Sequence, residues 1–376
     1  MKKMFMAAGM AAVMTACGTA GQKAATDAGN PFLAEYSTPF GVPPFDLIKV
    51  EHYKEAFLKG MEEQKKEIDA IVNQRSVPDF DNTIAAFDQS GELLNKVSTV
   101  FSGLNSCNTN DEMQAFNKEI TPLLSAHRDD ISLNPALFAR VKEVYERREK
   151  LGLDKEQNKL LEETYKKFVR GGANLDSVDQ AKLRQLNSEI SMLQLTFGQN
   201  LLKETNAFEL VIDKKEDLAG LPESLVASAA EAAKGAGMEE KWLFTLHNPS
   251  VMPFLQYADN RELREKIFKG YINRGNNGNE ADNNEIVKKL VALRLEKAKL
   301  MGYADYASFI LEDRMAKNEE NVYRLLNQIW TPAVAKAKEE LSDIQSEIKK
   351  EGANFTPEGW DWRYYFEKAK KAKFSL

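Results

Sequence analysis

The stretch "DNNEIVKKLVALRLEKAKLMG" (residues 282–302) has apolar residues that recur with the period of an α-helix. Asp282 followed by Glu285 predicts a capping box at the start of this helix, and Gly302 predicts its end. The apolar stripe consists of Ile286, Leu290, Leu293 and Leu300. We therefore expect an amphipathic helix that packs one face against the rest of the protein.

The helical period extends upstream and downstream of this stretch. Upstream, helices are predicted at roughly residues 50–73, 82–106, 110–128, 135–150, 154–170 and 176–204. Downstream, Asn318 is expected to cap a helix that ends at Thr331 and Pro332. Its predicted buried face is Val322, Leu325, Leu326 and Ile329. A further helix, with Val334, Leu341, Ile344 and Ile348 along one side, runs to Gly352, and we expect the two to lie antiparallel.

Two short runs depart from the helical period. In "NAFELVID" (206–213) and "KWLFTLH" (241–247), apolar residues alternate with a period of two, which is typical of strands that can pair. The alternating residues are Phe208, Leu210 and Ile212 in the first run and Trp242, Phe244 and Leu246 in the second. The predicted fold class is therefore mainly α, with a small β insertion near residues 206–250.

The stretch "WDWRYYFEKAKKAKFSL" (360–376) is rich in aromatic residues. Thr356 is expected as the N-cap of a helix and Pro357 as its first residue. Its aromatic residues are Trp360, Trp362, Tyr364, Tyr365 and Phe366, which together call for on the order of 1,000 Å² of partner surface. Because this apolar arc is wide, we predict an interior helix that is covered on several sides.

The composition is that of a globular protein with a net negative charge. The chain has 376 residues, of which 43% are hydrophobic, with 51 basic and 57 acidic residues and a net charge of −6. No block of basic residues precedes the lysines near the C-terminus, so the charge argues against binding to nucleic acid.

The first 17 residues, "MKKMFMAAGMAAVMTAC", have the layout of a secretory signal, with two lysines, an apolar run and small residues. The sequence "MTAC" resembles a bacterial lipobox, so residues 1–16 are interpreted as a lipoprotein signal and Cys17 as the lipidated residue. The alternative is an ordinary cleaved signal that ends near a cysteine. Residues 17–30 are small and polar and are expected to form a flexible tether. We expect a cell-envelope protein, lipid-anchored and facing the periplasm or the cell surface.

Reactive side chains form no recognisable catalytic pattern in this sequence. His52, His127 and His247 have no second histidine at zinc-ligand spacing, so we expect them to be hydrogen-bonded or at the surface. Cys107 is expected to be a small buried apolar residue. Carboxylate pairs such as Glu162 and Glu163 are expected to be solvated. No catalytic or metal-ligating residue is therefore predicted.

Eight segments, taken in order, are specific in combination. They include "PPFDLIKVEHYKEAF" (43–57), "PDFDNTIAAFDQSGELL" (78–94), "RGGANLD" (170–176), "NPSVMPFLQYADNRELREKIFKGYINRG" (248–275) and "EGWDWRYYFEKAKKAKF" (358–374). This series resembles the N-terminal half of the thimet oligopeptidase and peptidyl-dipeptidase (Dcp) family of zinc metallopeptidases. The resemblance implies a helical, two-lobed, neurolysin-like fold with a deep channel. It also implies hydrolysis of short peptides, with release of C-terminal dipeptides in the peptidyl-dipeptidase branch.

In that family Zn²⁺ is held by the two histidines of H-E-x-x-H and a later glutamate, and the motif lies beyond the "WDWRYY" segment. No position of this sequence matches it. The resemblance therefore implies that residues 31–250 are the N-terminal helical region, that 251–376 begin the catalytic lobe, and that a C-terminal half is the expected packing partner. We expect these residues alone to bind no Zn²⁺ and to be inactive. The alternative is a short non-catalytic lipoprotein that binds peptide or complements a partner chain.

Overall fold

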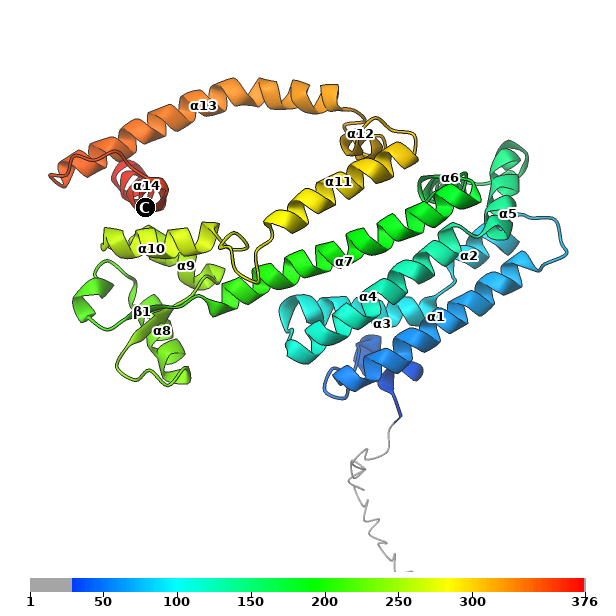
Figure 1. Ribbon diagram of the computed structural model, residues 1–376, viewed down its shortest axis with the longest axis horizontal. Coiled ribbons are helices and arrows are strands. Elements are labelled where there is room, and N and C mark those ends of the chain that lie inside the picture. Colours follow the sequence, from blue (N-terminus) through cyan, green and yellow to red (C-terminus); the bar gives the residue numbers. More distant parts are fainter. Residues whose placement is uncertain (1–28, 375–376) are drawn as a thin grey trace, which may run out of the picture.

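The computed structural model describes residues 29–374 and is mainly α-helical, as expected (Figure 1). The first helices are α1 (Val50–Val72), α2 (Ala86–Asp88), α3 (Glu92–Cys107), α4 (Asp111–Ser132), α5 (Pro135–Glu146), α6 (Lys155–Arg170) and α7 (Ser177–Ala207). They are followed by β1 (Leu210–Ile212), α8 (Glu223–Gly235), β2 (Trp242–Phe244), α9 (Asn248–Tyr257) and α10 (Arg261–Ile272). The last elements are α11 (Asn284–Leu300), α12 (Tyr306–Leu311), α13 (Glu319–Lys350) and α14 (Gly359–Phe374).

The N-terminal helices pack around aromatic side chains. Helix α1 lies against α3 and α4, and α4 lies against the long helix α7. The rings of Tyr53, Phe57, Phe101 and Phe116 meet between α1, α3 and α4, with the centroids of Tyr53 and Phe101 5.0 Å apart. Edge-to-face contacts of this kind add to the hydrophobic stabilisation of the core. Helix α7 packs on this region through α4, and α11 packs on α7.

The prediction of one continuous helix over 82–106 is wrong, because the helix is interrupted at Gly91. A π-helical turn (Phe80–Ala85) and α2 precede the break, and α3 follows it. Gly91 has φ 79°, and a Cβ there would lie 2.4 Å from the side chain of Gln64 on α1. Its N–H donates to Glu67 Oε2 at 2.7 Å. The close approach of α1 therefore requires glycine and ends the helix.

The small β insertion is confirmed. Strands β1 and β2 pair antiparallel, with Leu210 opposite Phe244 and Ile212 opposite Trp242. Phe244 is fully buried and meets Phe254 of α9 with ring centroids 4.7 Å apart. The two strands thus supply one side of a core that also includes α9 and α10.

The helix at 282–302 ends as predicted and begins differently. Gly302 has φ 85° and Tyr303 N donates to Ala298 O, which closes a C-terminal glycine motif. The predicted capping box is wrong, because the Asp282 carboxylate accepts from Gly278 N and Asn284 N and orders the preceding loop. Glu285 pairs with Lys288 one turn on.

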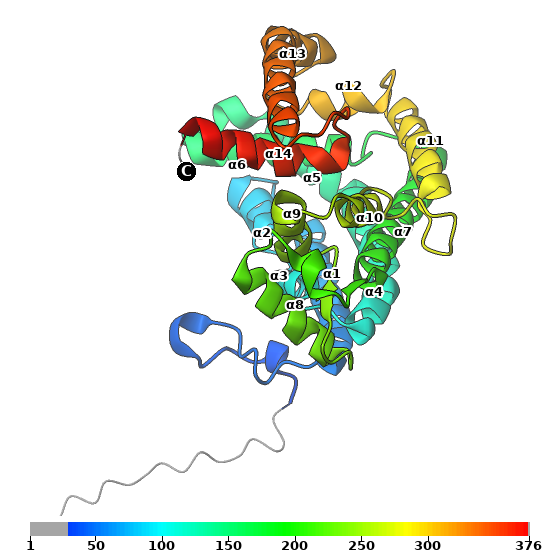
Figure 2. The same cartoon turned by 90° about the vertical axis from the view of Figure 1, so that its left-hand side faces the viewer.

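The predicted antiparallel pair after residue 318 is also wrong, since α13 is a single helix that passes through Pro332. A proline inside a helix removes one backbone hydrogen bond and causes a bend. Figure 1 shows α13 as a bowed helix above the others. Its C-terminal part packs on α14, which lies between α13 and the pair α9 and α10 (Figure 2).

The predicted lipidation residue, Cys17, lies outside the residues that the structure describes, so lipid anchoring stays a prediction. No helix within residues 29–374 is both long enough and apolar enough to cross a bilayer.

Candidate functional site

The three histidines lie in separate elements, and each has a hydrogen-bond partner. His52 Nδ1 accepts from Lys49 N at 3.1 Å at the start of α1. His127 of α4 is buried, with Nε2 2.7 Å from Gln64 Oε1. His247, before α9, contacts Thr245 Oγ1 at 3.0 Å and Asn206 Oδ1 at 3.2 Å. The expectation that they are hydrogen-bonded or at the surface is confirmed.

The zinc ion that the family resemblance implies does not fit the donors present in the described part of the chain. Between residues 29 and 374, no three His, Cys, Asp or Glu side chains come together as a metal site. A catalytic zinc site needs three protein ligands around one ion. No step of a reaction is therefore assigned to these side chains.

Cys107 corrects one prediction, because its side chain is exposed and not buried. It is the last residue of α3, where the helix meets solvent, and its thiol lies 3.1 Å from Gly103 O. Glu162 is exposed, and Glu163 pairs with Lys159 and Lys166 at 2.8 and 2.7 Å, as expected of solvated carboxylates.

A partly buried polar chain links α4, α7 and α11. Asn187 Nδ2 donates to Asp129 Oδ1 at 2.8 Å, and Lys297 Nζ donates to Asn187 Oδ1 at 2.6 Å. Burial raises the pKa of Asp129 and lowers the pKa of Lys297. Opposite pKa shifts in two linked groups occur at many active sites. Here the amide of Asn187 lies between Asp129 and Lys297, and these hydrogen bonds hold three helices together.

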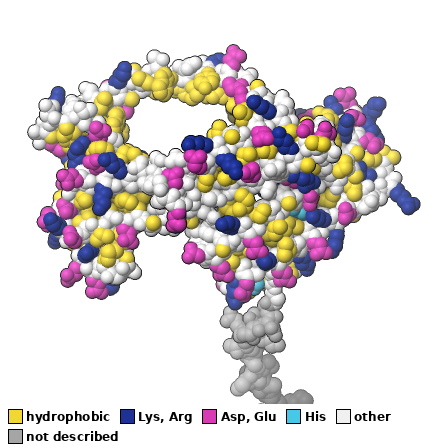
Figure 3. All heavy atoms as spheres, viewed as in Figure 1, with side chains coloured by type: hydrophobic (Ala, Val, Ile, Leu, Met, Phe, Trp, Pro, Cys, Tyr) yellow, Lys and Arg dark blue, Asp and Glu magenta, His cyan; other side chains and the backbone are white. Residues whose placement is uncertain are grey.

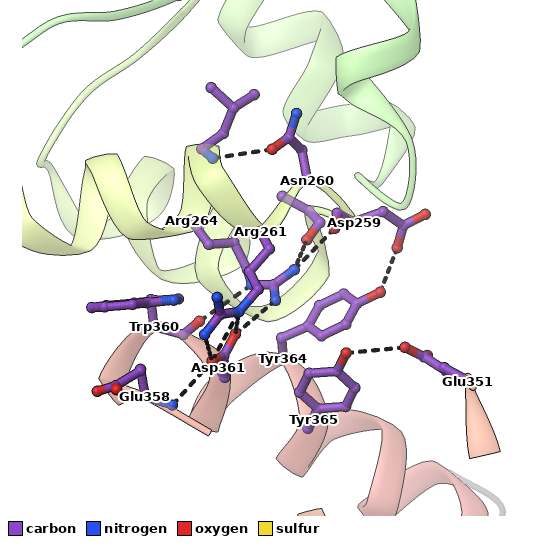
Figure 4. Close-up of polar contacts among 12 residues, drawn as sticks. Asp259, Asn260, Arg261, Arg264, Glu351, Glu358, Trp360, Asp361, Tyr364 and Tyr365 are labelled. Carbon is purple, nitrogen blue, oxygen red and sulfur yellow. Dashed lines mark hydrogen bonds and ion pairs between the residues drawn. The ribbon is translucent and has the colours of Figure 1, made fainter. Parts of the chain in front are cut away.

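The aromatic helix α14 is held by one carboxylate. Asp361 is fully buried and receives Arg261 Nη2 at 2.8 Å, Arg264 Nη2 at 3.0 Å and the backbone N–H of Glu358 at 3.0 Å (Figure 4). Burial raises the pKa of Asp361, but these hydrogen bonds and charges outweigh it and hold that pKa below its ordinary value. The carboxylate is therefore ionised and joins α14 to α10.

Arg264 is the buried cation of this cluster, which we define as Asp361, Arg261 and Arg264. It is 1% exposed and also donates to Ala258 O, Asp259 O and Trp360 O, at 2.8, 3.1 and 3.2 Å. Its guanidinium lies 4.0 Å from the centroid of the Tyr364 ring, whose hydroxyl donates to Asp259 Oδ1 at 2.7 Å (Figure 4). A buried ion is tolerated when all of its polar atoms are paired, as here.

The start of α14 differs from the prediction. The helix begins at Gly359, so Thr356 is not its N-cap and Pro357 is not its first residue. Asp361 accepts from Glu358 N and takes the capping role. Gly359 lies so close to Phe268 that a Cβ would be 2.5 Å from its ring. Close packing on α10 thus leaves no room for a side chain at the first residue of α14.

Earlier residues cover most of α14. Tyr364 and Tyr365 are buried against Ile344 and Ile348 of α13, while Phe366 remains exposed. The exposed apolar surface is instead on the N-terminal half of α13. There the predicted burial of Leu325, Leu326 and Ile329 is wrong, since no described element packs on them.

We define the α13 face as Tyr323, Leu325, Leu326, Ile329 and Trp330, all of them exposed. Trp330 is 70% exposed, which is unusual for so large an apolar side chain. Figure 3 shows hydrophobic side chains along α13 beside an opening that passes beneath it. Contiguous apolar surfaces of this kind mark interaction sites.

Sequence reasoning did not identify the Asp361 cluster, although both halves lie in quoted segments. Arg261 and Arg264 come from 248–275, and Asp361 comes from 358–374. A possible signal was the charge of Arg264 close to Leu263 and Ile267 in the sequence, and that of Asp361 between two tryptophans.

The chain is similar in sequence to known peptidases. Residues 254–376 match Peptidase family M3. Over 347 residues, 92% of this chain and 51% of the relative, it is 40% identical to dipeptidyl carboxypeptidase of Escherichia coli (strain K12). It is 28% identical to oligopeptidase A of Haemophilus influenzae, over 89% of this chain and 50% of that protein. Saccharolysin of Saccharomyces cerevisiae is 24% identical, over 80% of this chain and 42% of that protein.

The chain thus spans about half the length of the curated relatives it matches. The match to Peptidase family M3 falls on the segment that carries Arg261, Arg264 and Asp361. The mainly α architecture agrees with the family fold that the sequence segments imply. The chain is therefore similar to peptidase family M3, in agreement with the resemblance of its segments to the thimet oligopeptidase and peptidyl-dipeptidase family.

Proposed function

We propose that these 376 residues are the helical framework of a zinc peptidyl-dipeptidase that releases dipeptides from the C-termini of short peptides. The observation that carries this proposal is the 40% identity to a dipeptidyl carboxypeptidase over 92% of the chain. The identity to oligopeptidase A is lower, at 28%, which favours the dipeptidase branch.

The zinc ligands and the water-activating glutamate are proposed to come from polypeptide outside these 376 residues. The relatives are about twice as long as this chain, and H-E-x-x-H does not occur within it. When bound, the metal supplies a Lewis acid and an activated water. The present residues supply the support: Asp361 fixes α14 on α10, and α14 in turn carries the C-terminal part of α13.

The α13 face is the proposed contact surface for that polypeptide. Its five side chains are largely apolar and exposed, and Figure 3 shows hydrophobic side chains along α13 beside the opening. Apolar burial yields roughly 25 cal/mol per Å², so covering several large side chains stabilises a contact by several kcal/mol. The same surface would serve a separate partner chain, which is the alternative of a non-catalytic complementing lipoprotein.

The decisive assay measures release of C-terminal dipeptides from N-acylated tetrapeptides in the presence of Zn²⁺. The purified 376-residue chain is expected to give no turnover. A chimera that joins it to the remaining half of E. coli dipeptidyl carboxypeptidase is expected to release dipeptides and to lose activity with a chelator. Turnover by the 376-residue chain alone would contradict the proposal that the zinc ligands and the water-activating glutamate lie outside these residues. Release of larger fragments by the chimera would assign it to the oligopeptidase branch.

We further propose that Cys17 carries a lipid that holds the protein on the cell envelope. Expressed in a bacterium, the wild-type chain is expected in the membrane fraction, and Cys17→Ser is expected in the soluble fraction. Cys107→Ser is the matched control, since Cys107 is exposed at the end of α3 and lies outside the signal-like segment. Equal membrane association of wild type and Cys17→Ser would refute the anchor.

A further inference from the structure

The loop between α10 and α11, residues 273–283, contains Asn277 followed by Gly278, the only Asn-Gly pair in the sequence. Both residues are exposed, and Gly278 has φ 64° with open space where a Cβ would stand. An asparagine amide is attacked by the backbone nitrogen of the next residue most readily when that residue is glycine, because no side chain hinders the approach. No part of the proposed peptidase role uses this pair.

The loop is anchored by Glu204 of α7, which is 9% exposed. Its carboxylate accepts from Asn277 Nδ2 at 3.0 and 2.9 Å, and also from Gly275 N and from Asn279 Nδ2. Burial raises the pKa of Glu204, but these hydrogen bonds outweigh it and hold that pKa below its ordinary value. An ionised carboxylate therefore holds the loop, and it does so partly through the amide nitrogen of Asn277.

A second carboxylate restrains the attacking atom. Gly278 N donates to Asp282 Oδ2 at 2.9 Å. In the closed loop, both reacting groups, the Asn277 amide and the Gly278 nitrogen, are thus held by hydrogen bonds to carboxylates. Charge-assisted hydrogen bonds of this kind are stronger than neutral ones, so the attack has to wait for a local opening of the loop.

We propose that Asn277 is a site of spontaneous deamidation and that this modification releases the loop irreversibly. When the loop opens, the Gly278 nitrogen gives its proton to solvent and bonds to Cγ of Asn277. The Cγ–Nδ2 bond breaks, and the nitrogen leaves as ammonia after taking a proton from solvent. Water then opens the resulting five-membered imide and leaves an aspartate or isoaspartate at position 277. The net reaction is hydrolysis of an amide, with water as the only co-reactant.

The product does not fit the closed loop. A carboxylate at position 277 has no N–H to donate and would face the carboxylate of Glu204 at hydrogen-bond distance, where two like charges repel. The same loop carries Asn283, which is 4% exposed and is bonded to Asn200 and to Phe197 O of α7, at 3.0 and 3.1 Å. Opening the loop therefore loosens the start of α11 from α7. This inference does not depend on peptidase activity, because it uses only α7 and the loop.

Peptide mapping by mass spectrometry tests the site during incubation of the purified chain at mildly alkaline pH. Wild type is expected to deamidate slowly at Asn277. Glu204→Gln is expected to do so at least about tenfold faster, the factor that corresponds to one charge-assisted hydrogen bond. Glu280→Gln is the matched control, since Glu280 pairs with Lys203 at the surface, and it is expected to react like wild type. Asn105, which precedes Ser106 within α3, is the slow internal reference in every digest.

The release of the loop is tested separately by limited proteolysis. Asn277→Asp imitates the product and is expected to be cleaved within residues 273–283 several-fold faster than wild type. Asn276→Asp places the same charge on the neighbouring residue, but Asn276 Oδ1 accepts from Asn284 Nδ2 at 2.7 Å, and a carboxylate keeps that bond. It is therefore expected to be cleaved like wild type.

Absence of deamidation at Asn277 in Glu204→Gln, or equal rates in wild type and Glu204→Gln, would overturn the assignment of the site. Equal cleavage of Asn277→Asp and Asn276→Asp would overturn the release of the loop. If Glu204→Gln fails to fold, Asp282→Ala replaces it, because it frees the Gly278 nitrogen at the surface of the loop and is expected to accelerate deamidation several-fold.

Discussion

Replacement of Asp361 by alanine is expected to lower the free energy of unfolding by about 3 kcal/mol, the lower end of the range for breaking a buried ion pair. The variant leaves Arg264, which is 1% exposed, with an uncompensated charge. Arg261 contributes less, because its side chain is 38% exposed and can be hydrated after the loss. Arg264 also keeps its bonds to three carbonyl oxygens, which reduces the cost.

The measurement is urea unfolding at pH 7, followed by tryptophan fluorescence and by far-ultraviolet circular dichroism. Trp360 and Trp362 flank Asp361, so two of the four tryptophans report on α14, and circular dichroism reports the helical content of the whole chain. Asp343→Ala is the matched control, since Asp343 pairs with Lys373 at a partly exposed site and is expected to cost less than about 1 kcal/mol. A loss in Asp361→Ala no larger than in the control would refute the anchoring role.

The same cluster predicts a pH dependence with a definite sign. Since the folded-state pKa of Asp361 lies below its ordinary value, its stabilisation is complete above the unfolded pKa of about 3.9 and is lost as the pH falls through the folded pKa. The difference in stability between wild type and Asp361→Asn should therefore be constant from pH 7 to about pH 5 and should narrow below about pH 4. A difference that grows on acidification would contradict the assigned ionisation.

Three further perturbations test other parts of the fold. Gly91→Ala is expected to lower the free energy of unfolding, measured by thermal unfolding, by at least about 2 kcal/mol. Gly152 also has a positive φ, of 64°, but has open space around it, so Gly152→Ala should lower it by only about 1 kcal/mol. Equal losses of stability would show that Gln64 can move aside. Glu204→Ala removes the carboxylate that accepts from Gly275 N, Asn277 and Asn279, so proteolysis within residues 273–283 should accelerate. Glu280→Ala is the control, because Glu280 pairs only with the exposed Lys203, and it should leave the rate of proteolysis unchanged. Trp330→Ser should change the free energy of unfolding by less than about 0.5 kcal/mol and reduce light scattering from self-association, and a large loss of stability would mean that the α13 face is covered.

Local patterns in the sequence were sufficient for most elements of the fold. The helical period located α1, α4, α6 and α7, and a period of two located both strands, because these periods reflect one buried face. Gly302 was correctly identified as a helix end, since a positive φ is a local requirement. These features depend on residues that are close together in the chain.

Predictions failed where a distant segment decided the outcome. At Gly91 the backbone has a positive φ and a Cβ would meet Gln64 of α1, and at Gly359 a Cβ would meet Phe268 of α10. The apolar stripe of α13 was predicted to be buried, but no described element lies on it. A helical period of apolar residues predicts that one face of the helix is suited to burial, but it does not identify the segment that covers that face.

The sequence by itself determined that this chain is mainly α-helical, that it is similar to peptidase family M3 and that it contains no H-E-x-x-H. Only the tertiary structure decided that Asp361 meets Arg261 and Arg264 about one hundred residues earlier, and that a cavity opens among α1, α3, α4 and α6. The physical reason is that periodicity and caps are local properties of the backbone. The pairing of buried charges and the shape of a hollow depend on how helices from distant parts of the chain pack together.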